Sequence, residues 1–423
     1  MNHKNHNRSS FSGKIGFVLS AAGASVGLGN IWRFPYLAAK YGGGIFLLIY
    51  IILALTFGYT MIVAETALGR MTKKSPVGAF AAFGKKGGLS FGGWINAIIP
   101  ILIVPYYSVI GGWVIKYLVE YVKGNTQNLA TDGYFSEFIS NGVSTEICFL
   151  VFALFTVGII YAGVRNGVER VSKFMMPVLV FLSIVITVYS VTRPGALEGV
   201  KYFLIPNPKN FSWMTVVSAM GQMFYSLSIA MGILYTYGSY VRKDMDIERS
   251  TTQVEVFDTG IAILAGLMII PAAFAAMGSG EAVAENSGPT LMFVVLPQVF
   301  GGLGDMAPII GGVFFILVLF AALTSSISLV ETCTAIIQDA THCKRSTALI
   351  VTIIWTTLMG VIVNLGFGAL SFIQPLGEGS TMLDFFDFIS NSVMMPVVAL
   401  LTCIFIGWIV GTKSLEEEVM LSA

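Results

Sequence analysis

Two stretches of this chain place glycine and polar residues inside apolar segments. The first is SVGLGNIWRFPY, residues 25–36, and the second is YSLSIAMG, residues 225–232. A helix broken at these places frees backbone carbonyls and amides that lipid cannot satisfy. Carbonyls, together with side chains such as Asn30, Ser226 and Ser228, are oxygen ligands for a hard cation, and the positive end of a half-helix attracts a carboxylate. Glycine-mediated helix packing is the alternative, but two matched interruptions with polar side chains favour a binding site.

A third stretch, AALTSSISLVE at residues 321–331, carries small hydroxyl residues at helical spacing. Thr324, Ser325 and Ser328 would share part of one helix face, and taken alone they pack helices more often than they bind ligands. A carboxylate inside an apolar segment requires a partner or a function. The carboxylates in this position are Glu65, Asp258 and Glu331.

The elements that position these residues are membrane-spanning helices. Of the 423 residues 55% are hydrophobic and only 11% are charged, with a mean hydropathy of +0.80, whereas a soluble domain carries roughly a quarter charged residues. The apolar runs are too long for barrel strands, and helices satisfy the backbone within lipid. We therefore expect an all-α polytopic membrane protein. The ten expected spans are 15–38, 44–68, 95–122, 146–164, 172–192, 213–240, 256–277, 308–338, 348–366 and 382–411.

The spans form two halves of a single transmembrane domain, residues 1–423. One half covers about 15–192 and the other about 213–411, and the interrupted spans 1 and 6 come first in each. In an inverted repeat of five plus five spans, the two interrupted spans are expected at these corresponding positions. Most of the 24 Lys and Arg residues lie on the same side as the N-terminus. This bias predicts that both termini are cytoplasmic.

Several other functions are excluded by what the chain contains. The net charge of +1 gives no sign of a nucleic-acid partner. The 3 histidines, His3, His6 and His342, lie in polar segments, and no nucleophile with a base or metal cluster is recognisable, so we do not expect an enzyme. A channel needs a polar file across the membrane, whereas the polar residues here concentrate at the middle and ends of the spans.

Three motifs together strongly resemble the neurotransmitter:sodium symporter family, in its bacterial amino-acid transporter branch. They are GLGNIWRFPY, GQMFYSLSIAMG and ALTSSIS, and the resemblance runs from Arg8 to about Lys413. It implies a five-plus-five inverted-repeat core with discontinuous spans 1 and 6, sodium-coupled amino-acid uptake by alternating access, and a place in the bacterial cytoplasmic membrane. A monomer or a weak homo-oligomer is expected.

The resemblance also implies two sodium sites and an amino-acid pocket. One sodium would bind the carbonyls of Gly23, Val26 and Ala321 and the hydroxyls of Thr324 and Ser325. The other would bind the Ser25 carbonyl, the Asn30 and Ser226 side chains and the substrate carboxylate, beside Asp258. The pocket residues would be Ser25, Leu28, Gly29, Ile103, Tyr107, Tyr225, Ser226, Ser228, Met231, Ser325 and Leu329.

Gates on both sides of the pocket follow from the same resemblance. On the outside Arg33 would pair with Asp384 or Asp387, of which we favour Asp384, and Tyr107 and Tyr225 would form an aromatic lid. On the inside Arg8 would pair with Asp339 and be steadied by Tyr240.

One departure from the family pattern and the pocket composition refine the expected activity. Asp258 occupies the position of an ion-binding asparagine of the family and supplies a fixed negative charge, so we expect chloride independence, and proton antiport on the return step is compatible with it. The apolar Ile103, Met231 and Leu329 favour a large hydrophobic or aromatic amino acid. The alternative is a transporter-like sensor that binds sodium and the amino acid without accumulating it.

Overall fold

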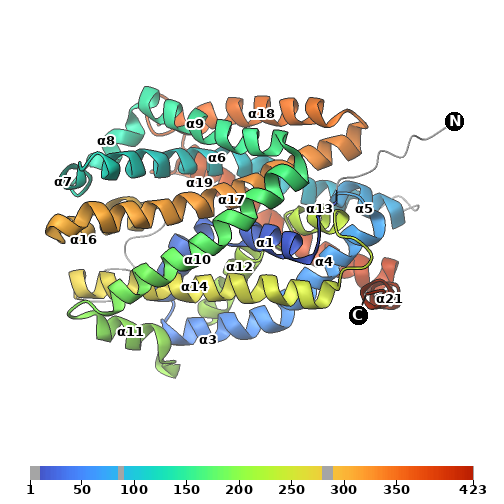
Figure 1. Cartoon of the computed structure of the whole chain (residues 1–423), viewed down its shortest axis with the longest axis horizontal. Coiled ribbons are helices and arrows are strands. Elements are labelled where there is room, and N and C mark those ends of the chain that lie inside the picture. Colours follow the sequence, from blue (N-terminus) through green and yellow to red (C-terminus); the bar gives the residue numbers. More distant parts are fainter. Residues whose placement is uncertain (1–9, 84–89, 279–288, 423) are drawn as a thin grey trace.

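The computed structural model describes residues 10–83, 90–278 and 289–422, and every regular element within them is helical. Figure 1 shows long helices running side by side, with shorter helices at their ends. Within the described residues eight helical segments are long and apolar enough to cross a membrane, and the pair of helices on either side of a 52° bend makes up to nine. The structure confirms the all-α polytopic fold.

The helices follow the predicted order closely. The first half of the chain forms α1 (Lys14–Ser25), α2 (Phe34–Lys40), α3 (Gly44–Leu53), α4 (Tyr59–Thr72), α5 (Pro76–Phe83), α6 (Ser90–Val122), α7 (Thr126–Leu129), α8 (Tyr134–Ser140), α9 (Gly142–Tyr161) and α10 (Arg170–Val191). The second half forms α11 (Ala196–Leu204), α12 (Trp213–Ser226), α13 (Ile233–Ser239), α14 (Ile247–Met277), α16 (Leu296–Gly301), α17 (Ala307–Thr341), α18 (Arg345–Leu365), α19 (Met382–Asp387), α20 (Met395–Phe405) and α21 (Thr412–Met420). Wider π-helical turns extend several of them: Gly29–Arg33, Ala54–Gly58, Val164–Glu169, Leu291–Val295, Phe388–Met394 and Ile406–Val410.

Span 1 is interrupted where the sequence predicts it. The helix α1 ends at Ser25, and Val26 adopts an extended backbone with φ −74° and ψ 100°. Helical structure resumes at Gly29 and continues into α2 at an angle of 52° to α1.

Span 6 is interrupted in the same way. The helix α12 ends at Ser226 and α13 begins at Ile233, so the connecting residues 227–232 are not helical. Ser228 and Ala230 adopt positive φ angles of 57° and 62°. This conformation costs a non-glycine residue roughly 1–2 kcal/mol, so surrounding contacts must hold the interruption in place.

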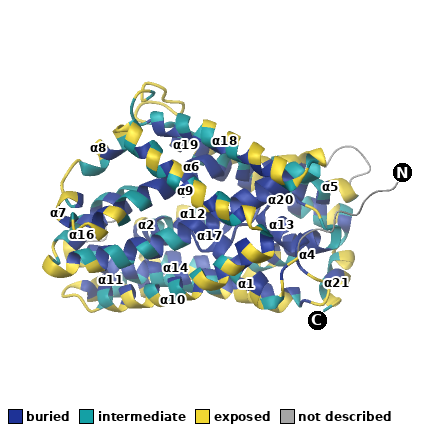
Figure 2. Cartoon of the chain, turned by 45° about the horizontal axis from the view of Figure 1, so that its top comes forward, coloured by how far each residue is buried: buried dark blue, intermediate teal, exposed yellow. Residues whose placement is uncertain are grey.

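The long helices pack in two groups around these interruptions. The helices α6, α9, α17 and α18 contact one another, and a second group consists of α1, α2, α4, α13 and α14. The helix α1 also contacts α10 and α17, so it lies between the groups. Figure 2 shows the buried residues concentrated along the central helices and the exposed residues on the outer faces.

Two spans begin earlier than the apolar pattern predicts. Span 7 was expected from residue 256, but α14 begins at Ile247 because Asp246 caps it: the Asp246 side chain accepts a hydrogen bond of 2.9 Å from the Arg249 N–H. Span 5 likewise begins at Val164. The first turns of both are polar, and a hydropathy pattern does not include them although the helix continues through them.

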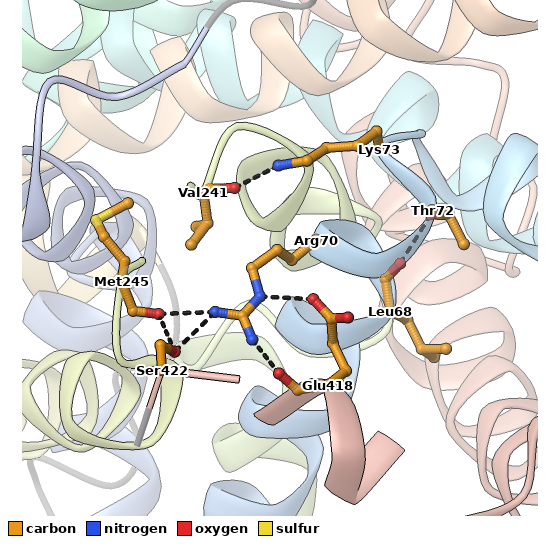
Figure 3. Close-up of polar contacts among 8 residues, drawn as sticks. All are labelled: Leu68, Arg70, Thr72, Lys73, Val241, Met245, Glu418 and Ser422. Atoms are coloured by element: carbon orange, nitrogen blue, oxygen red, sulfur yellow. Dashed lines mark hydrogen bonds and ion pairs between the residues drawn. The ribbon is translucent and has the colours of Figure 1, made fainter. Parts of the chain in front are cut away.

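The helix α21, which hydropathy does not predict, is held by a buried arginine. Arg70 on α4 donates from Nε to Glu418 Oε1 over 2.7 Å and from Nη1 to the Met245 carbonyl over 2.7 Å and to Ser422 Oγ over 3.0 Å (Figure 3). These bonds join α4, the α13–α14 connection and α21 at one end of the bundle. We call this the α21 end.

Candidate functional site

A carbonyl is left without its helical partner where α1 ends. In a continuous helix the Gly27 N–H would bond to the Gly23 carbonyl. Here the Gly27 N–H donates to Asn30 Oδ1 over 3.1 Å instead. The interruption therefore frees the Gly23 carbonyl oxygen from helical hydrogen bonding. The Asn30 side chain stabilises the interruption by accepting the Gly27 N–H.

The Ser325 hydroxyl on α17 faces this end of α1. Its oxygen lies 3.2 Å from the Gly23 carbonyl, 3.1 Å from the Ala24 carbonyl and 3.2 Å from the Val26 carbonyl. One hydroxyl proton cannot satisfy three carbonyls, so the group carries a surplus of oxygen lone pairs. A hard cation is the ligand that such oxygens suit.

The remaining predicted ligands of this sodium lie beside Ser325. The Thr324 hydroxyl oxygen is 3.2 Å from the Ala321 carbonyl, and a Cβ at Gly23 would lie 3.1 Å from Thr324 Cβ. All predicted ligands of this site are thus neighbours: Gly23, Val26, Ala321, Thr324 and Ser325. The described part of the chain contains no group of three or more His, Cys, Asp or Glu side chains able to hold a metal ion, so the donors offered here are carbonyl and hydroxyl oxygens.

A second polar group surrounds Asp258, which is fully buried on α14. Asn30 Nδ2 donates to its Oδ1 over 2.8 Å, and the Ser226 hydroxyl lies 2.9 Å from both carboxylate oxygens. Tyr50 on α3, which the sequence analysis does not single out, donates to Oδ2 over 3.3 Å. Among the described residues no Lys or Arg forms an ion pair with Asp258. A nearby cation would therefore be favoured electrostatically.

A small cavity of about 30 Å³ lies at the interruptions of spans 1 and 6. Its lining includes ten of the predicted pocket residues, namely Ser25, Leu28, Gly29, Ile103, Tyr107, Tyr225, Ser228, Met231, Ser325 and Leu329. Ala24, Gly27 and Ile233 also line it. Ser226, the remaining predicted residue, faces Asp258 instead. A larger apolar cavity of about 250 Å³ between the ends of α10 and α14 contains none of the predicted residues.

Close approaches explain the glycines of span 1. A Cβ at Gly27 would lie 2.8 Å from the Tyr107 hydroxyl oxygen, and a Cβ at Gly29 would lie 2.5 Å from the Tyr225 ring. The Tyr107 hydroxyl accepts a bond of 3.3 Å from the Leu28 N–H. Glycine therefore lets the backbone approach both tyrosines and leaves the Leu28 amide facing the cavity.

A buried carboxylate supports the interruption of span 6. The Ala230 N–H donates to Glu65 Oε1 over 3.0 Å, and both residues are fully buried. This bond lies within the connection in which Ala230 has a positive φ. A carboxylate in a span was expected to have a partner or a function. For Glu65 the structure shows a partner, the Ala230 N–H.

The predicted outer gate includes Tyr225, which lines the cavity. The Arg33 guanidinium lies over the Tyr225 ring, 5.1 Å from its centroid. Among the described residues it forms no ion pair with either candidate aspartate.

The sequence favours Asp384 as the partner of Arg33, whereas the geometry favours Asp387. Asp384 caps α19, because its Oδ2 accepts bonds of 2.8 Å from both the N–H and the hydroxyl of Thr381. Asp387 instead accepts from the Tyr106 hydroxyl over 3.2 Å and from Asn391 over 2.5 Å. A capping side chain would have to leave its helix terminus in order to reach Arg33.

Of the predicted inner gate, the structure describes Asp339 and Tyr240. Arg8 lies outside the described residues. Asp339 accepts a bond of 2.6 Å from the Ser75 N–H. The Tyr240 carbonyl accepts a bond of 3.2 Å from the Phe11 N–H, so the N-terminal segment reaches the α21 end.

Tyr240 also belongs to a buried network that the sequence does not predict. Its hydroxyl donates to Glu331 over 2.7 Å, and the Arg345 guanidinium binds the same carboxylate over 2.8 and 2.5 Å. Glu331 was expected to have a partner or a function, and Arg345, 14 residues further along the chain, is the partner. Gln222, which donates to the Gly29 carbonyl over 3.0 Å, was also missed. Its polar side chain in an apolar half-helix was the signal.

Comparisons with known proteins cover almost the whole chain. The profile of the Sodium:neurotransmitter symporter family matches residues 8–138 and 135–422. The Uncharacterized sodium-dependent transporter YhdH of Bacillus subtilis (strain 168) is 36% identical over 96% of this chain and 89% of its own. The human Sodium- and chloride-dependent GABA transporter 2 is 27% identical over 97% of this chain and 75% of its own. The crystal structure of MhsT in complex with L-phenylalanine is 35% identical, with a TM-score of 0.88 over 98% of this chain and 93% of that one.

Proposed function

Because the chain belongs to the sodium:neurotransmitter symporter family, whose members include sodium-dependent transporters, we propose that it imports a hydrophobic or aromatic amino acid together with sodium by alternating access. The observation that carries the proposal is the surplus of carbonyl lone pairs around Ser325 beside the cavity between spans 1 and 6. The oxygen ligands around Ser325 and the adjoining cavity support a role in transport and not in catalysis.

Two sodium ions bind in this proposal. One occupies the Gly23, Val26, Ala321, Thr324 and Ser325 oxygens. The second binds the Ser25 carbonyl, Asn30 and Ser226, with Asp258 supplying negative charge. The Asn30–Asp258 and Ser226–Asp258 distances of 2.8 and 2.9 Å support this assignment.

The substrate carboxylate completes the second sodium site. It meets the sodium, the Leu28 and Gly29 amides and the Tyr107 hydroxyl, so the sodium and the carboxylate offset the charge of one another within a buried site. Removal of either ligand leaves the other with an unbalanced charge. This mutual requirement couples sodium binding to amino-acid binding, and the coupling is reciprocal.

The side-chain part of the cavity is apolar. Ile103, Met231, Ile233 and Leu329 line it, and none of its described lining residues is acidic or basic. A large hydrophobic or aromatic side chain gains free energy when it is buried against such residues, whereas a small polar one does not. MhsT, whose fold this chain shares, was crystallised in complex with L-phenylalanine, which is consistent with the same class of substrate here.

Asp258 makes transport independent of chloride in this proposal. A fixed carboxylate supplies the negative charge that chloride provides in chloride-dependent transporters, and it allows a proton to be carried on the return step. The buried position of Asp258 and its hydrogen bonds to Asn30, Ser226 and Tyr50 support the assignment.

The gates close the cavity on both sides. Arg33 and Asp387, with Tyr107 and Tyr225, close it on the outside, and Arg8 with Asp339, steadied by Tyr240, closes it on the inside. We place the protein in the bacterial cytoplasmic membrane as a monomer or weak homo-oligomer, with the α21 end in the cytoplasm.

Sodium-driven uptake into proteoliposomes tests this function. A symporter accumulates labelled phenylalanine or leucine when sodium is imposed outside, and does not when potassium replaces it. A sensor of the same fold binds the amino acid in the presence of sodium without accumulating it. Binding without uptake would therefore reject the symporter proposal in favour of the sensor.

A further inference from the structure

The larger apolar cavity, of about 250 Å³, lies where the ends of α10 and α14 meet α16 and the start of α17. Figure 1 shows α16 at one end of the bundle and α21 at the other. The polar Ser190 in its wall is already bonded, because its hydroxyl donates to the Met268 carbonyl over 2.6 Å. The walls therefore suit a hydrocarbon chain and not a polar solute. Most of the lining is apolar and includes Ile186, Met268, Leu296, Phe300, Ile310 and Phe314.

Arg193 is the one charged side chain among the described residues that line this cavity. It is exposed, and its guanidinium lies over the Tyr189 ring, 5.2 Å from the centroid. No Asp or Glu of the described chain forms an ion pair with it. The ring contact orients the guanidinium, and its N–H donors match the oxygens of a phosphate or a carboxylate. The cavity thus combines apolar walls with one anion-binding group.

The helix beside the cavity faces lipid up to the level of Arg193. Phe181, Val185 and Val188 lie on one face of α10 and are 64%, 40% and 56% exposed. The helix ends at Val191, and Arg193 follows two residues later. Tyrosine and arginine at the end of a span lie at the level of the lipid headgroups. Acyl chains therefore lie beside the cavity, and lipid phosphates lie near Arg193.

We propose that this cavity binds one acyl chain of an anionic phospholipid from the leaflet at this end of the bundle, with the lipid phosphate on Arg193. A zwitterionic lipid has the same chains and a phosphate, but its ammonium group offsets the attraction to the guanidinium. The preference for an anionic headgroup therefore comes from Arg193, and the affinity for the chain comes from the apolar walls. This site is separate from the cavity at the interruptions of spans 1 and 6, and it does not depend on the transport proposed above.

A chain in this cavity contacts α10, α14, α16 and α17 at once. Such a ligand stabilises the folded arrangement to which it binds. Local opening of α16 should therefore become rarer when the lipid is bound, and amide exchange of that helix reports on it.

Native mass spectrometry of the purified, delipidated full-length protein tests the proposal. Phosphatidylglycerol and phosphatidylethanolamine with identical acyl chains are the two probes. We expect wild type to bind one phosphatidylglycerol more tightly, and Arg193→Gln to weaken that binding about fivefold, as expected for one cation at a membrane surface. Lys209→Gln, which removes an exposed cation from the α11–α12 connection, is the matched control and should have little effect.

A second pair of variants fills the cavity without changing its charge. Ala272→Phe and Ala276→Phe place a ring at lining positions of α14, and should weaken the binding of both lipids to a similar extent. Ala276 is exposed, so its substitution is tolerated even if Ala272→Phe does not fold. With saturating phosphatidylglycerol, peptides within 296–303 should exchange deuterium more slowly in wild type, and Ala276→Phe should lack this protection.

Equal affinity of wild type for the two lipids would overturn the proposal, because lipid would then surround this surface without selection. An effect of the charge variant without an effect of the cavity variants, or the reverse, would also overturn it. Palmitate carries an acyl chain and an anionic group, and displacement of phosphatidylglycerol by an equal concentration of palmitate would identify a fatty-acid site instead. All these measurements are made without a sodium gradient, so the failure of sodium-driven uptake would reject the proposed function and leave the lipid site standing.

Discussion

The Asn30 side chain donates to Asp258 over 2.8 Å and accepts from the Gly27 N–H over 3.1 Å. One residue thus bridges the interruption of span 1 and the buried carboxylate of span 7. Asn30→Ala should weaken sodium and amino-acid binding together, each by about 10- to 100-fold, since a hydrogen bond to a buried charge contributes roughly 1.5–3 kcal/mol. Scintillation proximity binding with labelled amino acid over a series of sodium concentrations measures both. Asn364→Ala is the matched amide control, and a change in only one of the two affinities would contradict the shared site.

Asp258→Ser removes the fixed negative charge of the second polar group. Uptake by this variant should require chloride in the external buffer, because the cation would otherwise lack a balancing charge. Uptake in chloride is compared with uptake in gluconate, and the exposed Asp305→Ser serves as the control. If Asp258→Ser transports equally well in both buffers, Asp258 does not replace chloride.

Ser325→Ala removes the hydroxyl that faces the Gly23, Ala24 and Val26 carbonyls. The sodium concentration for half-maximal uptake should rise about tenfold, which corresponds to about 1.4 kcal/mol of binding free energy. The neighbouring Ser326→Ala is a stringent control because Ser326 lies 3.3 Å from Thr156, away from α1. Equal effects of the two substitutions would remove Ser325 from the site.

Met231→Phe places a rigid ring in the wall of the cavity. Overpacking typically costs about 1–3 kcal/mol, so bulky substrates should lose affinity by about 5- to 150-fold while leucine and smaller amino acids lose less. Competition of unlabelled tryptophan, phenylalanine, leucine and alanine against a labelled substrate gives the order. An unchanged order of affinity would exclude Met231 from the side-chain pocket.

Glu418→Ala leaves the fully buried Arg70 guanidinium without its carboxylate (Figure 3). Loss of one partner of a buried ion pair costs about 3–5 kcal/mol, so thermal unfolding in detergent should occur at a clearly lower temperature. Glu417→Ala, an exposed neighbour on α21, should have little effect. Similar unfolding temperatures for both variants would mean that the pair does not stabilise α21.

Much of the fold could be predicted because lipid imposes strong constraints on sequence. Long apolar runs can cross a membrane only as helices here, and glycine with asparagine or serine inside such a run marks a break. The interruptions at Val26 and at 227–232 were therefore recognisable. The starts of span 5 and of α14 were not, because their first turns are polar and lie outside the apolar pattern.

The site was predictable only where the residue types themselves carry the chemistry. The oxygen group of Ser325 and the pocket lining were expected from the resemblance of three motifs to a known family. Pairings between distant segments were not predictable in this way: the choice of Asp387 over Asp384 depends on which aspartate caps α19, and the Tyr50 contact with Asp258 joins spans 2 and 7. The local sequence does not predict which side chains contact one another across the bundle.

Accumulation of labelled phenylalanine in proteoliposomes against its own gradient tests the central claim most directly. With an inward sodium gradient in chloride-free buffer, the internal concentration should exceed the external one, and a sodium ionophore should abolish the excess. Uptake that only equilibrates phenylalanine, or accumulation that persists after the sodium gradient has collapsed, would contradict sodium-coupled symport by this chain.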